Sequence, residues 1–222
     1  ISGPKARDIL AKLAEVDLAT LRMMHCDTLD IGLHRLRAGR LSLSGELAFE
    51  LHCHASEHAQ VRQLLLNAGA DDGLKEIGFS AMFSMRLEKG YRSYGTDMTS
   101  EHNPHEAGLA FSVRKGGGYI GAEAFEALDP AAITRKLVCL VFDNPEHVVM
   151  GKEPVFVAGS PAGYTTSSYF GHSIGKQIAY AWLPIEHTTL GTQVSVKYFD
   201  SMYPAVVSDD PQFDASMSRL RS

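Results

Sequence analysis

The chain has 222 residues, 45% apolar and 21% charged, so it is long enough to bury the core of one or two domains. Its 21 basic and 26 acidic side chains give a net charge of −5, which argues against a surface that binds nucleic-acid phosphates. The three cysteines lie far apart and show no disulfide or CxxC spacing, which favours a reducing compartment. The sequence contains no apolar run of about 18 residues and no signal-peptide pattern, so it predicts no membrane span.

The first part of the chain alternates helical and extended patterns. Apolar residues at helical spacing predict four helices, the third apolar almost all round, at residues 2–13, 56–69, 79–90 and 121–128. Apolar and polar residues alternate, as in strands, over residues 25–54 and 109–114. Ser2 and Ser56 are the expected N-terminal caps of the first two helices, and Gly69 is the expected C-terminal cap of the second. A polar stretch with the turn signal Asn103-Pro104 follows the third helix.

Beyond Asp129-Pro130 the sequence offers strands and turns but no amphipathic helix. Six short strand candidates, separated by glycines, cover residues 136–142, 154–158, 163–167, 176–183, 193–199 and 203–208. So many strands in fewer than a hundred residues are typical of a small barrel or sandwich. We therefore predict one domain over residues 1–130 and a second over residues 131–222.

Three motif-like patterns have both an ordinary and a functional interpretation. Residues 116–121 match GxGxxG, but a plain glycine turn is favoured over a dinucleotide site, because the following helix is short. His52, His54 and His58 supply at most three ligands to a metal, and a polar strand face is the simpler interpretation. The charged residues within 86–92 indicate either a solvated helix face or buried groups with partners.

Glu50 is the most suggestive single residue. The alternation places it in mid-strand, on the face opposite Phe49 and Leu51. A carboxylate can accept two parallel N–H donors, and the 2-aminopyrimidinone edge of a pterin offers such a donor pair. A solvated strand-face glutamate is the alternative.

Several motifs occur in a fixed order along the chain. They are GPKARDIL at 3–10, SGELAFEL at 44–51, SMRLEKGYR at 84–92, NPHEAGL at 103–109, YIGAEAF at 119–125, RKLVCL at 135–140, GYTTS at 163–167, GKQIAYA at 175–181 and YPAVV at 203–207. The series resembles the folate-binding region shared by the glycine-cleavage aminomethyltransferase (T-protein) family and the C-terminal half of dimethylglycine and sarcosine dehydrogenases. The likeness to the dehydrogenases is closer, and it covers nearly the whole chain.

The resemblance implies an α+β folate-binding domain of the aminomethyltransferase type, followed by a small C-terminal antiparallel β-barrel. It also implies transfer of a one-carbon unit from an aminomethyl or iminium group to tetrahydrofolate, giving methylene-tetrahydrofolate. Glu50 falls on the family's pterin-contacting glutamate. Tyr94 falls on an aromatic position that lines the folate cleft or serves packing. A non-catalytic folate-binding module, or a folate-dependent O- or S-demethylase, remains an alternative.

The chain departs from the family pattern at its beginning. Met82 stands where the T-protein pattern has an arginine. The aspartate that engages the reacting amine, and the FAD-binding dehydrogenase domain, are expected upstream of Ile1, so we assign no catalytic residue. If the chain begins at an internal helix, we expect Ile9, Leu10 and Leu13 to be exposed or covered by another copy. The implied partners are folate, an amine donor and an upstream oxidoreductase, in the bacterial cytoplasm or the mitochondrial matrix.

Overall fold

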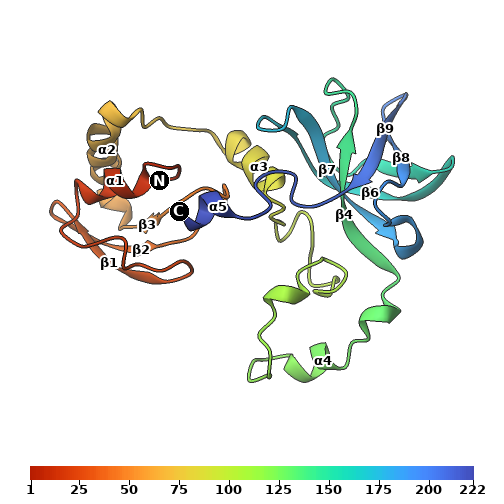
Figure 1. The fold of residues 1–222 in the computed structure, drawn as a ribbon, viewed down its shortest axis with the longest axis horizontal. Helices are drawn as coiled ribbons and strands as arrows, with labels where there is room; N and C mark the ends of the chain where they lie inside the picture. Colours follow the sequence, from red (N-terminus) through yellow and green to blue (C-terminus); the bar gives the residue numbers. More distant parts are fainter. The chain divides into compact units, whose positions relative to one another are not determined.

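The computed structural model describes residues 1–222, which divide into two compact units (Figure 1). Unit 1 comprises Ile1–Lys89 together with Asp214–Ser222, and unit 2 comprises Gly90–Phe213. The last nine residues of the chain therefore belong to the same unit as its beginning.

Unit 1 is built from a small antiparallel sheet and short helices. Its elements are α1 (Ala6–Ala11), β1 (Cys26–Ile31), β2 (His34–Gly39), β3 (Glu50–His52), α2 (His58–Gly69), α3 (Phe79–Glu88) and α5 (Ser218–Arg221). The sheet order is β1-β2-β3, and in its register Glu50 lies opposite Gly39. Residues 1–3 also pair with the segment before β3, since Gly3 N donates to the Leu47 carbonyl oxygen at 2.8 Å and Ser2 bridges Ala48.

The core of unit 1 is covered by the chain's own residues. Ile9 and Leu10 of α1 are 3% and 0% exposed, and Leu10 joins the cluster of Leu29, Leu36 and Phe49. Our expectation that the face of the first helix would be exposed or would need a second copy is therefore wrong. The sheet and α2 supply enough apolar surface to bury it.

The helix boundaries of unit 1 differ in detail from the prediction. The side chain of His54, not Ser56, caps the turn before α2, because it accepts the Ser56 N–H. Gly69 is the last residue of α2 with an ordinary negative φ, and the left-handed glycine that ends the following 3-10 turn is Gly73. Gly69 instead allows close packing, because an added Cβ would lie 2.5 Å from the Leu74 Cβ.

The third helix, α3, is the reverse of the expected apolar helix. Phe79 at its beginning is 76% exposed, whereas Arg86, Glu88 and the adjoining Lys89 are at most 2% exposed. The solvated-face interpretation of these charges is wrong. A buried charge requires a partner, and Lys89 has one in Asp214.

Unit 2 begins with turns rather than regular elements. Residues 109–114 do not form the predicted strand but a single 3-10 turn, Ala110–Ser112. The predicted short helix is present as α4 (Ala122–Glu126). The Asn103 side chain makes the expected turn, because its Oδ1 accepts the backbone N–H groups of His105 and Glu106 at 2.9 and 3.0 Å.

The second half of the chain forms a closed six-stranded antiparallel barrel. Its strands are β4 (Arg135–Phe142), β5 (Pro154–Val157), β6 (Ser160–Gly171), β7 (Lys176–Pro184), β8 (Gln193–Tyr198) and β9 (Ser201–Ser208), in the order β4-β7-β6-β5-β8-β9 with β9 pairing back to β4. Figure 1 shows these strands wrapped around one another. All six strand predictions and the barrel fold are confirmed. Leu140, Phe142, Val155 and Val196 are fully buried inside.

The boundary between the compact units does not coincide with the point near residue 130 where the sequence pattern becomes strand-rich. Residues 90–134 group with the barrel, and the chain crosses between units at 89–90 and again at 213–214. The domain boundary near residue 130 stays a prediction. No helix is long and apolar enough to cross a membrane.

Candidate functional site

A cleft of about 560 Å³ lies in unit 1 against Glu50. Its walls come from β3, from α2 and from the segment that follows α2. The apolar part of the lining is Ile1, Phe49, Leu51, Cys53, Val61, Leu65, Leu66 and Leu74. Its polar part includes Glu50, His52, His58, Arg62, Lys75 and Glu76. A volume of about 300–1,000 Å³, mostly apolar walls and a few polar groups are typical of small-molecule sites.

Glu50 is held by the strand and stays available to a ligand. The neighbouring Phe49 is 1% exposed in the core, whereas the Glu50 side chain is about half exposed, at 49%. Its Oε2 lies 3.5 Å from His52 Nε2, two residues along the same strand face. The carboxylate therefore keeps most of its lone pairs free to accept donors from a molecule in the cleft.

The rim of the cleft carries an ion pair that connects α2 to the segment after it. Arg62 Nε donates to Glu76 Oε1 at 2.6 Å, and its second donor reaches the other carboxylate oxygen. This two-point contact raises the pKa of Arg62 and lowers that of Glu76. Both groups are accordingly ionised at neutral pH, and the pair links α2 to the segment after it at the rim of the cleft.

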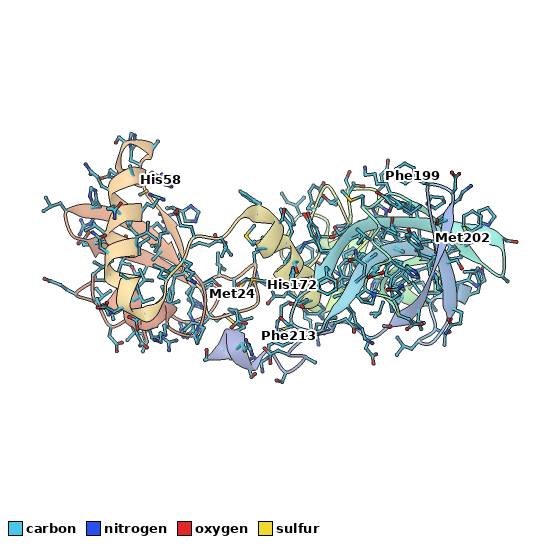
Figure 2. All side chains as sticks on the ribbon, turned by 90° about the horizontal axis from the view of Figure 1, so that it is seen from above. Met24, His58, His172, Phe199, Met202 and Phe213 are labelled. Carbon is cyan, nitrogen blue, oxygen red and sulfur yellow. The ribbon has the colours of Figure 1, made fainter.

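The three histidines of the metal hypothesis are not brought together. His54 Nδ1 contacts Ser56 Oγ at 2.8 Å, while His52 faces Glu50. His58 begins α2 (Figure 2). Across the chain no group of three or more His, Cys, Asp or Glu side chains is arranged to hold a metal ion.

Tyr94, the second residue that the resemblance assigned to folate, lies in unit 2. It sits in a tight turn in which Gly95 N donates to the Met98 carbonyl oxygen at 2.8 Å, and its side chain is 71% exposed. Glu50 and Tyr94 therefore belong to different units. The 116–121 loop has left-handed glycines at Gly116, Gly117, Gly118 and Gly121, and the strand that a dinucleotide site needs is absent before it.

A buried ionic cluster in unit 2 was missed by the sequence reasoning. Asp210 pairs with Arg92 at 2.7 Å and accepts the Tyr180 hydroxyl at 2.9 and 3.0 Å, and the Arg92 guanidinium stacks on the Tyr180 ring. Burial raises the pKa of Asp210, while Arg92 opposes the rise. Burial also raises the pKa of the Tyr180 hydroxyl and of the nearby Cys139 thiol. The one sequence signal for this cluster was Arg92, in the motif at 84–92 that continues past the end of α3.

Comparison with known proteins agrees with the fold. Residues 1–116 match the family described as the GCVT N-terminal domain, and residues 135–214 match the glycine cleavage T-protein C-terminal barrel domain. Dimethylglycine dehydrogenase, mitochondrial, of Homo sapiens is 33% identical over 95% of this chain and 25% of its own length. An aminomethyltransferase of Symbiobacterium thermophilum is 34% identical over 88% of this chain and 53% of its own length.

A third relative is named as an oxidase, and a solved structure shares the fold. The 4-methylaminobutanoate oxidase (formaldehyde-forming) of Paenarthrobacter nicotinovorans is 34% identical over all of this chain and 27% of its own length. The structure of the glycine cleavage system aminomethyltransferase T from Bartonella henselae covers 96% of this chain and 83% of its own, with a TM-score of 0.58 and 20% identity. The chain thus spans about a quarter of the oxidising relatives and half of the aminomethyltransferase.

Proposed function

Because this chain belongs to the glycine-cleavage T-protein family, we propose that it binds tetrahydrofolate in the Glu50 cleft for one-carbon transfer. The product is methylene-tetrahydrofolate, and the one-carbon unit arrives as an iminium made elsewhere. The names of the relatives, which include a dehydrogenase, an oxidase and an aminomethyltransferase, support this reaction class.

The observation that carries the proposal is the half-exposed Glu50 carboxylate at an apolar-walled cleft. A pterin is flat and largely apolar on its faces, while one edge carries two adjacent N–H donors. The apolar lining suits the faces, and the two oxygens of Glu50 suit the edge. The residues present therefore fit the group.

Bound tetrahydrofolate supplies the two amine nitrogens that take up the one-carbon unit. The residues of the chain hold and orient it, because Glu50 fixes one edge of the ring and the apolar walls exclude water from its faces. Positioning is thus the main contribution of this region. Tyr94 is the second proposed folate contact, and its exposed ring is available for stacking.

The proposal also covers the source of the iminium. We propose that this region works with the aspartate that engages the reacting amine in the family. We also propose an FAD-dependent oxidoreductase domain or subunit as its partner. The 116–121 loop lacks the strand that the strand–glycine–helix context of a dinucleotide site requires. Oxidation is accordingly assigned to the partner and folate binding to this chain.

The test is a calorimetric titration of the chain with tetrahydrofolate under reducing conditions. We expect binding to weaken by about tenfold or more in Glu50→Gln, because one N–H donor of the pterin then faces the amide NH2 group. Glu15→Gln is the matched control, since Glu15 is exposed and lies outside the cleft. Unchanged affinity in Glu50→Gln would remove Glu50 from the site.

A further inference from the structure

The last nine residues, Asp214–Ser222, form a C-terminal strap on unit 1. They follow the barrel in sequence, and the barrel family's match ends at residue 214, yet they pack with residues 1–89. Their single helical turn, α5, is capped by Asp214, whose carboxylate accepts the backbone N–H groups of Ser218 and Arg219 at 3.1 and 3.2 Å. The strap is therefore an ordered segment, and its contacts define what it holds.

The first contact of the strap is with the end of α3. Lys89 Nζ donates to Asp214 Oδ2 at 2.8 Å and to its carbonyl oxygen at 2.9 Å, and the side chains are 2% and 8% exposed. The hydrogen bond from Lys89 holds the pKa of Asp214 well below its usual range. The stem of Lys89 lies against Gly45, where an added Cβ would come within 2.6 Å of the Lys89 Cε. Lys89 is thus packed between the strap and the turn at Gly45.

Three further contacts join the strap to the turn at Gly45 and to two arginines elsewhere in unit 1. Arg219 Nη1 pairs with Glu46 Oε1 at 2.9 Å, and the Glu46 side chain is only 12% exposed. The carbonyl oxygen of Ser222 accepts one donor each from Arg7 and Arg40, both at 3.0 Å. Together with Lys89, these contacts join the strap to four parts of unit 1: the end of α3, α1, the residue after β2 and the turn before β3.

This turn leads directly into the strand that carries Glu50. It is already constrained by hydroxyl contacts, since Gly45 N donates to Ser42 Oγ at 3.0 Å and Ser2 Oγ lies 2.6 Å from Ser44 Oγ. Glu50 follows Glu46 by four residues, and the residues between them are buried. A displacement of the turn would therefore be carried along a packed segment to the Glu50 carboxylate.

We propose that the strap positions Glu50 for its ligand, with Arg219 and Asp214 as positioning residues that act through Glu46 and Lys89. The inference rests on the proposed function of the cleft and adds a specific dependence on the C-terminal segment. The strap, which follows the barrel in sequence, thereby limits the movement of the strand that carries Glu50.

The experiment compares Arg219→Gln with Arg221→Gln in the full chain. Both changes remove one positive charge from α5, but only Arg219 contacts Glu46. We expect Arg219→Gln to weaken tetrahydrofolate binding by about fivefold and to speed amide hydrogen exchange over residues 44–52. Arg221→Gln should match the wild type in both. The charge-swapped pair Glu46→Arg with Arg219→Glu should restore both properties, which a general loss of stability would not allow.

Hydrogen exchange separates the two ideas, because it needs no ligand. If the wild-type chain binds no tetrahydrofolate, the proposed function fails, and exchange over residues 44–52 alone decides whether the strap holds the turn. Equal exchange over residues 44–52 in the Arg219→Gln and Arg221→Gln variants would overturn the proposal that the strap positions Glu50. If the wild type binds tetrahydrofolate, equal affinity of the two variants for it would overturn the proposal as well. Thermal unfolding followed by far-ultraviolet circular dichroism confirms that each variant is folded, because Trp182, the single tryptophan, lies in the barrel and does not report on unit 1.

Discussion

Gly90→Ala should destabilise unit 2 through the buried cluster around Asp210. Gly90 has a left-handed φ of +74°, and an added Cβ would lie 2.6 Å from Asp210 Oδ1 and 3.2 Å from its Cγ. A left-handed alanine costs roughly 1 kcal/mol in backbone strain. Moving the Asp210 carboxylate to an ordinary contact distance also stretches its bonds to Arg92 and Tyr180, and weakening this partly buried network costs about 2 kcal/mol more.

The matched control is Gly95→Ala, in the same polar stretch of unit 2. Gly95 has a similar φ of +88°, but its added Cβ would meet nothing within 4 Å. It therefore carries the backbone strain without the clash. For a protein of this size, 1 kcal/mol shifts the unfolding midpoint by about 2–4 °C. We expect shifts of about 2–4 °C for Gly95→Ala and about 6–12 °C for Gly90→Ala.

The assay is thermal unfolding followed by Trp182 fluorescence. Trp182 lies in β7 and is 3% exposed, so its emission reports the loss of the barrel core. Equal shifts in the Gly90→Ala and Gly95→Ala variants would refute the reasoning, because the Asp210 cluster would then contribute nothing. A double variant with Asp210→Ala should lose most of the extra effect of Gly90→Ala.

Three further predictions concern the thiols, the strap and the second folate contact. A thiol reagent should label the exposed Cys26 quickly and the buried Cys139, whose pKa is raised by burial, only after unfolding; equal rates would contradict this burial. The pKa of Asp214 is lowered in the folded state, so its stabilisation is fully present above about pH 4 and declines as the pH falls from there toward the lowered pKa. Urea midpoints of the wild type and Asp214→Asn should therefore converge from pH 6 to pH 3; a constant difference would contradict the ion pair. Tyr94→Ala should weaken tetrahydrofolate binding about fivefold by loss of stacking, as measured by titration, and an unchanged affinity would assign Tyr94 to packing.

The barrel could be predicted closely because its signals are local. Short runs of β-branched and aromatic residues between glycines set each strand, and five of the six strands begin and end within two residues of the prediction. The exception is β6, predicted over 163–167 and observed as Ser160–Gly171. A register shift between Thr165 and Ser168 interrupts the alternation of β6. The sequence pattern therefore did not predict the part of the strand that follows this irregularity.

The failures lie where distant segments determine the structure. The run at 109–114 has strand propensity but no neighbouring strand to pair with, so it forms a turn. The charges at the end of α3 are buried because partners such as Asp214 arrive from more than a hundred residues away. For the same reason the Asp210 cluster and the C-terminal strap could not be predicted from periodicity.

The candidate site was predictable in part. The exposed side of Glu50 follows from the alternation over residues 47–51, and the structure has it, but Glu50 begins β3 and does not lie in mid-strand. The cleft itself depends on how α2 and the segment at 74–76 pack beside β3, which no local pattern specifies. The folate roles of Glu50 and Tyr94 remain proposals.

The most direct test of the account is a binding cycle that changes both Glu50 and the pterin edge. The wild type and Glu50→Gln are each titrated with tetrahydrofolate and with an analogue whose 2-amino group is replaced by methyl. If Glu50 accepts the donor pair, the analogue binds the wild type about tenfold more weakly than tetrahydrofolate, and Glu50→Gln narrows this difference to about twofold. An undiminished preference for the 2-amino group in Glu50→Gln would contradict the central claim.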